Sequence, residues 1–129
     1  MILKKSEEPQ NKTPQRLREI IDENIQILHR SMMLMVSILN GDATALSIKA
    51  ANTPESAEKI LNIPPIKAAL EYKAKHLLTS PKSVKPQTTE TQFRMDVVME
   101  DGEVFGYGCD KTSLLDMSIA MYEEEMSKK

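Results

Sequence analysis

The side chains that most often do chemistry in proteins are few and scattered in this sequence. His29 lies within a helical pattern and His76 near a predicted helix end, too far apart in the chain to suggest a pair. Cys109 is the only cysteine, so no internal disulfide is possible, and no histidines stand beside it to complete a metal cluster. The glutamates at 123–125 form a run that is typical of a solvated helix face. We therefore expect no catalytic residues, no metal and no cofactor.

One glycine pair deserves comparison with a cofactor motif. The segment Gly106-Tyr107-Gly108 contains half of the glycine pattern that binds dinucleotides. It lacks the third glycine before a helix, and the chain has no parallel strand–helix–strand unit to support it. The sequence therefore predicts a protein that is not an enzyme.

The composition predicts a small globular protein whose charges are unevenly spread. Residues 1–82 carry 12 Lys and Arg against 9 Asp and Glu, whereas residues 83–129 carry 5 against 10. Such asymmetry suggests nucleic acid at the basic end and a protein partner at the acidic end. The single cysteine suits a reducing cytosol, and no apolar run approaches the roughly 20 residues that span a membrane. We expect a cytoplasmic protein with no membrane partner.

Nine methionines stand against two phenylalanines and no tryptophan. Methionine fills irregular gaps in a core and also adapts to varied partners. The composition alone therefore leaves two interpretations open, a methionine-lined core and a surface that repacks around a partner.

The elements that position these residues begin with a long helix. Residues 1–13 are polar and predict a disordered arm. Thr13-Pro14 predicts a helix start, and Asn40-Gly41 predicts its end. From residue 32 to 39 this helix is apolar nearly all round, so it must be covered on all sides. We expect that cover to come from other subunits, through an oligomer interface that includes Leu28, Met32, Met35 and Leu39.

Residues 14–79 predict a helical domain that ends in short helices. Asp42 is the expected cap of the first, and Thr53-Pro54 is the expected start of the second. The prolines at 64 and 65 end that helix, and a third is expected from Ile66 to about Leu78.

In the last third of the sequence, the apolar residues recur with a different period. Residues 80–90 predict a linker, and residues 91–129 predict a β-hairpin followed by a helix that Asp110 caps. Asp101-Gly102 indicates a two-residue type I′ turn, which would pair Met99 with Val104. The predicted fold class is α+β, mainly α, with a long N-terminal helix, helix-turn-helix-like helices, a β-hairpin and a C-terminal helix.

Residues 39–71 resemble the helix-turn-helix segment of phage terminase small subunits. The family's entry pattern, G-x-A-T-x-A, corresponds to Gly41-Asp42-Ala43-Thr44-Ala45. Its S/T-P-x-x-A turn corresponds to Thr53-Pro54-Glu55-Ser56-Ala57, and its N-P-x-V-x-x-A-L close is matched by Asn62, Pro64, Pro65, Ile66, Ala69 and Leu70.

This resemblance implies a viral protein that recognises double-stranded DNA for packaging, works as a homo-oligomer and acts in the host cytoplasm. A helix-turn-helix places its second helix in the major groove, while neighbouring elements hold phosphates. The implied DNA-binding residues are Lys49, Asn52, Thr53, Ser56, Lys59 and Lys67.

Two other functions remain open at this point. The acidic unit at 91–129 suits a small phage-type interaction or inhibitor protein that acts through a protein partner. Residues 91–122 resemble the C-terminal half of a double-stranded-RNA-binding domain, with a hairpin, Gly106 and Gly108, and a helix. That family grips phosphates with a lysine pair at the helix start, where Lys111 stands alone here, and a net charge of −5 over residues 83–129 opposes phosphate binding.

Overall fold

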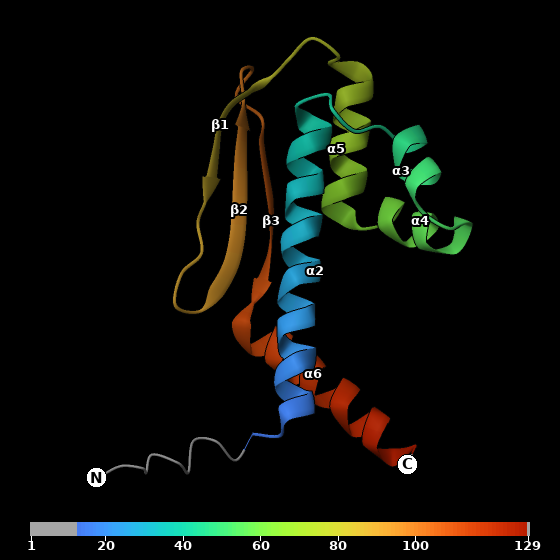
Figure 1. Ribbon diagram of the computed structural model, residues 1–129. Coiled ribbons are helices and arrows are strands. Elements are labelled where there is room, and N and C mark those ends of the chain that lie inside the picture. Colours follow the sequence, from blue (N-terminus) through green and yellow to red (C-terminus); the bar gives the residue numbers. More distant parts are fainter. Residues whose placement is uncertain (1–12, 129) are drawn as a thin grey trace.

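The computed structural model describes residues 13–128, in which five helices accompany one three-stranded antiparallel sheet (Figure 1). The predicted class, α+β and mainly α, is confirmed. The predicted arm, residues 1–13, lies outside the described residues except for Thr13. The elements in chain order are α2 (Gln15–Leu39), α3 (Ala45–Ala51), α4 (Pro54–Leu61), α5 (Pro64–Lys75), β1 (Pro81–Pro86), β2 (Gln92–Met99), β3 (Val104–Asp110) and α6 (Lys111–Ser127).

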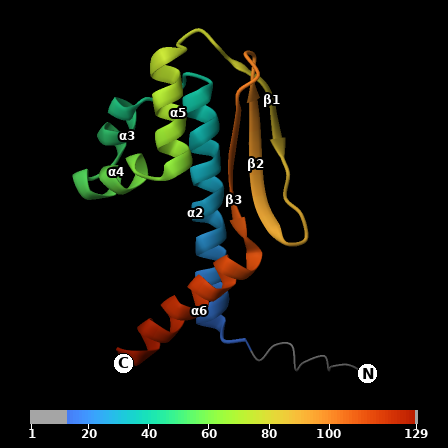
Figure 2. The same cartoon turned by 180° about the vertical axis from the view of Figure 1, so that it is seen from behind.

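The long helix α2 is the common partner of the other layers. The sheet lies on one side of it, α5 packs beside it, and α6 crosses its N-terminal half (Figures 1 and 2). Its predicted start at Thr13 is wrong by one position, because Pro14 is the N-cap and no side chain caps the helix. Its predicted end is confirmed, since Gly41 has a φ of 85°. There the amide of Gly41 donates to Ile38 and that of Asp42 to Ser37, which is a Schellman motif.

The C-terminal half of α2 is buried within a single chain. Met35 and Leu39 are fully buried, and they share one core with Ile66 of α5 and with Val97 and Met99 of β2.

The predicted oligomer interface therefore needs correction. Met32, Met35 and Leu39 are core residues of the monomer, and the partly buried Leu28 packs against the same core. The cover that the helix requires comes from α5 and the sheet, which the sequence pattern did not reveal as its neighbours.

The predicted linker at 80–90 also needs correction, because Pro81–Pro86 forms β1 and pairs antiparallel with β2. β1 is an edge strand with a proline at each end, a position where a missing amide is tolerated. Most of its side chains are exposed, so the apolar alternation that marks a half-buried strand is absent. That absence is why the strand pattern could not be read from the sequence.

The hairpin between β2 and β3 forms, but its register is shifted by one residue from the prediction. Val98 pairs with Val104, so the loop has three residues, Glu100 to Gly102. Gly102 alone has a positive φ in this loop, at 94°, which makes the type I′ turn wrong. The amide of Gly102 donates to Met99, as in a type I turn followed by a left-handed glycine.

A polar contact ties this hairpin to α5. The hydroxyl of Tyr72 donates to the Asp101 carboxylate at 2.7 Å, and the Tyr72 ring packs edge-on against Phe105 with centroids 5.0 Å apart. Burial and the hydrogen bond to Asp101 raise the pKa of Tyr72 to about 12. The hydrogen bond from Tyr72 lowers the pKa of the Asp101 carboxyl. The contact therefore stabilises the neutral tyrosine beside an ionised aspartate.

The helix α6 packs across the N-terminal half of α2, where the apolar Ile20 and Leu114 are buried and polar contacts also form. Asn24 donates to the buried Ser118 hydroxyl at 2.9 Å, and Arg16 makes a bidentate pair with Glu125 at 2.7 and 2.9 Å. Asp110 stands at the N-cap, as predicted, but its side chain does not cap the helix and instead accepts from Gln92.

The core assignment of Met35 predicts a large stability loss on truncation. Met35→Ala should lower the free energy of unfolding by about 2–5 kcal/mol, because it leaves a cavity in a fully packed site. Met33→Ala on the same helix is the matched control, since Met33 is 43% exposed, and should cost about 0.5 kcal/mol or less. Urea unfolding followed by circular dichroism measures both. Similar losses in the two variants would contradict this burial pattern.

The Tyr72–Asp101 contact predicts a pH-dependent stability difference. Tyr72→Phe should lower the urea midpoint at neutral pH. The folded pKa of Tyr72 is raised, so its contribution is complete below pH 10.0 and is lost as the pH rises through about 12. The folded pKa of Asp101 is lowered, so its contribution is complete above 3.8 and is lost as the pH falls through the lowered value. Urea midpoints of wild type and variant, measured from acid to alkaline pH, should converge at both extremes; a constant difference would rule out this linkage.

Candidate nucleic-acid interface

The helices α3 and α4 stand apart from the main body. They lie on the side of the α2–α5 pair that faces away from the sheet (Figures 1 and 2). Each contributes one buried side chain, Ile48 from α3 and Ala57 from α4, and most of the others are exposed. The pair is therefore held by few apolar contacts and presents most of its surface to solvent.

Threonine caps explain why these two short helices form. The Thr44 hydroxyl accepts from the Ser47 amide at 3.1 Å, and the Ser47 hydroxyl accepts from the Thr44 amide at 2.8 Å. This capping box replaces the predicted cap at Asp42, which is wrong by two positions. The predicted start of the second helix is confirmed, because Thr53 caps α4 and Pro54 is its first residue.

The third helix starts earlier than predicted. Pro64 and Pro65 begin α5 rather than only ending α4, because proline is tolerated in the first turn, where its missing amide needs no partner. The helix ends at Lys75, three residues before the predicted end.

The six predicted DNA-binding residues are all exposed, but the side chains of two of them already make hydrogen bonds within the chain. Asn52 and Thr53 are engaged in local hydrogen bonds: the Asn52 amide donates to the Ile48 carbonyl at 2.7 Å, and the Thr53 hydroxyl accepts from the Ser56 amide at 3.2 Å. Their first role is therefore to shape the turn between α3 and α4. Lys59 lies on α4 and Lys67 on α5, so the predicted lysines are spread over three helices.

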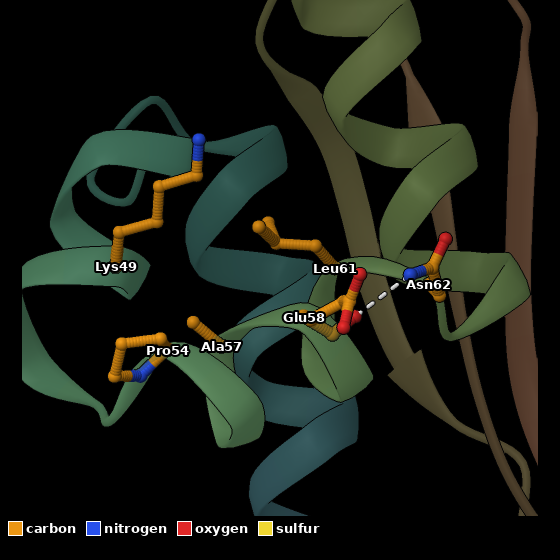
Figure 3. A pocket seen from close by; sticks show the side chains of 6 residues that line it. All are labelled: Lys49, Pro54, Ala57, Glu58, Leu61 and Asn62. Atoms are coloured by element: carbon orange, nitrogen blue, oxygen red, sulfur yellow. Dashed lines mark hydrogen bonds between the residues drawn. The ribbon is translucent and has the colours of Figure 1, made fainter.

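A groove of about 530 Å³ separates α3 from α4 (Figure 3). Lys49 stands on its α3 side, while Pro54, Ala57 and Leu61 give it an apolar α4 wall. Asn62 closes the far end, where its amide donates to the Glu58 carbonyl at 2.9 Å. Sequence reasoning identified Lys49 here but missed the apolar wall, because the spacing of α4 residues does not reveal how far α3 stands from it.

The charge around these helices is close to balanced. Residues 40–79 contain five lysines and four acidic residues. The ammonium group of Lys73 donates hydrogen bonds to the carbonyls of Leu77 and Thr79. It therefore stabilises the turn after α5. Because phosphate affinity grows with the number of phosphates neutralised, one copy of this unit offers little electrostatic attraction.

Lys111, the lone lysine at the start of α6, contacts an aromatic ring. The ammonium of Lys111 lies over the Phe93 ring, 5.2 Å from its centroid, and Asp110 stands next to it. Gly106 and Gly108 face strand β2, where the Arg94 side chain lies against Gly106 and the Phe93 carbonyl lies against Gly108. These glycines therefore admit close contacts within the sheet.

Within the part of the chain that the structure describes, no cluster of His, Cys, Asp and Glu could hold a metal ion. None of the described helices is long and apolar enough to cross a membrane. Comparison of the chain with protein-family models, with curated proteins and with solved structures gives no match.

The cap of α4 yields a local prediction. Thr53→Ala should destabilise α4 by about 0.5–2 kcal/mol, because the Ser56 amide loses its acceptor. Amide hydrogen exchange should therefore accelerate over residues 54–61. Thr53→Ser, which keeps the hydroxyl, is the matched control and should retain most of the protection. Equal protection in Thr53→Ala and wild type would show that the cap does not hold this helix.

Proposed function

We propose that this chain is a DNA-binding protein that resembles a phage terminase small subunit, recognises viral DNA for packaging as an assembly of identical copies, and has no catalytic activity of its own. The observation that carries the proposal is the helix pair α3–α4. Its helices are joined by the two-residue turn Asn52-Thr53, each is capped by a threonine, and the pair projects from the body. On this proposal the protein acts in the host cytoplasm.

The exposed start of α4 is the part that would meet the duplex. Ser56 and Lys59 lie along α4, and Lys49 and Lys67 flank it from α3 and α5. The acidic Glu55 and Glu58 share α4 with Lys59, which weakens general attraction to phosphate. An acidic residue accepts from the amino group of cytosine, so this helix suits base reading better than tight non-specific binding.

The near balance of positive and negative charge around α3 and α4 limits the DNA affinity of a single copy. A single copy with so few unopposed lysines binds weakly, whereas several linked copies bind one DNA molecule with a much higher effective concentration. Assembly is therefore part of the proposed function.

The test is a titration of duplex DNA over a range of salt concentrations. Lys49→Ala/Lys59→Ala should reduce the slope of log affinity against log salt by about two, since each lost phosphate contact removes roughly 0.9. The matched control is Lys82→Ala/Lys85→Ala in β1, which removes the same charge from the far side of the sheet and should leave the slope near that of wild type. Equal slopes for all three proteins, or no binding by wild type at low salt, would contradict the proposal.

A second candidate is an interaction protein that acts through its acidic C-terminal unit. The observation that favours it is α6, where Leu115, Met117 and Met121 are each more than 40% exposed beside Asp116 and a glutamate run. Failure to bind DNA in the titration above, together with a stable complex with another protein, would select this candidate.

A further inference from the structure

We propose that Arg30 of α2 is a further DNA-binding residue, and that the groove beside it takes a sugar-phosphate segment of the duplex next to the start of α4. This inference rests on the proposed function, because it adds a contact to the same DNA-binding surface. Sequence reasoning did not include Arg30, since it lies on the long helix and outside the helix-turn-helix-like segment at 39–71.

A groove of about 290 Å³ lies between α2 and the α3–α4 pair. Six residues line it: Ile27, Arg30, Ser31, Leu34, Asn52 and Ile60. The four on α2 follow helical spacing, so they share one side of that helix. Asn52 directly precedes the Thr53 cap of α4. The groove therefore connects the long helix to the part of the surface that would meet DNA.

The lining of this groove matches the chemistry of a DNA backbone. The aliphatic side chains of Ile27, Leu34 and Ile60 suit contact with deoxyribose rings. Arg30 and Ser31 offer N–H and O–H donors to phosphate oxygens. Of the described residues that line the groove, none is acidic, whereas Glu58 lines the groove between α3 and α4.

The guanidinium of Arg30 is not used to hold the fold together. The other three arginines each have a partner within the chain: Arg16 pairs with Glu125, Arg94 pairs with Asp96, and Arg18 donates to Gln15. Arg30 is exposed and makes no ion pair or side-chain hydrogen bond with any residue that the structure describes. Its donors are therefore available to a ligand.

The positive charge of Arg30 is also weakly opposed along its own helix. No acidic residue lies three or four positions away from it on α2. The nearest acid along the helix is Glu23, about 10 Å distant, and its carboxylate already lies 3.5 Å from Arg16. In contrast, Lys59 shares the short helix α4 with Glu55 and Glu58.

An arginine at this position would orient the protein on the duplex. A guanidinium donates two parallel hydrogen bonds to one phosphate, which fixes direction as well as distance. Contacts to phosphates set the register of a protein on DNA, whereas contacts to base edges supply sequence specificity. Because α2 is also the helix on which α5, α6 and the sheet pack, a phosphate held by Arg30 would fix the whole body relative to the base-reading side of α4.

The test is the salt dependence of binding to a mixed-sequence DNA duplex. Arg30→Ala should reduce the slope of log affinity against log salt by roughly 0.9, because one phosphate contact is lost. Arg18→Ala is the matched control, since it removes the same charge from the same helix about 18 Å away, and should leave the slope near that of wild type. Arg30→Lys should keep most of the slope but bind more weakly at every salt concentration, because the second parallel hydrogen bond is lost.

Urea unfolding accompanies the titration. Arg30 is exposed and unpaired among the described residues, so Arg30→Ala should keep a midpoint near that of wild type, and a change in slope then reports a lost contact. A wild-type slope in Arg30→Ala, or an equal reduction in Arg30→Ala and Arg18→Ala, would overturn this inference. If Lys49→Ala/Lys59→Ala still lowers the slope in that case, the proposed function stands without Arg30. No binding by wild type at low salt would remove both.

Discussion

The fold depends on the burial of one half of one helix. From Met32 to Leu39, α2 carries apolar side chains on nearly every side, and a helix of that kind is stable only when neighbours cover all of it. The chain supplies that cover with α5 on one side and the sheet on another, so that Met35, Ile66 and Val97 share one core. The same packing covers the apolar face of the sheet, because Met95, Val97 and Met99 of β2 belong to this core.

The N-terminal half of α2 is held by its contact with α6, which includes buried polar groups. There Asn24 and Ser118 form a buried polar pair joined by a hydrogen bond, and the apolar Ile20 of α2 and Leu114 of α6 are buried as well. A polar contact fixes the register of two helices but contributes less burial than leucine or isoleucine would. Leu114 is buried in this contact, whereas Leu115 and Met117 of α6 stay partly exposed.

Local signals predicted the described helices and some of their boundaries, whereas contacts between segments distant in sequence determined the features that were missed. Thr53-Pro54 and Asn40-Gly41 fix their helix boundaries through hydrogen bonds within a few residues, so both could be read from the sequence. The cover of Met35 and the pairing of β1 depend on which segments meet in space, and the exposed edge strand has no apolar alternation to announce it. For the candidate site, the exposed positions of Lys49 and Lys59 follow from helical spacing, but the grooves beside α3 depend on the angle between helices, which spacing does not specify.

The core of this chain and its exposed periphery consist of different residues. Its core lies in the middle, between α2, α5 and the sheet, and none of Lys59, Leu77 or Met117 belongs to it. Substitutions at these solvent-facing positions therefore leave the core packing in place. In the proposed function, the exposed start of α4 is the part of this periphery that would meet DNA. Because α4 is short and carries Glu55 and Glu58 beside Lys59, the proposed function would need several copies on one DNA molecule to reach a useful affinity.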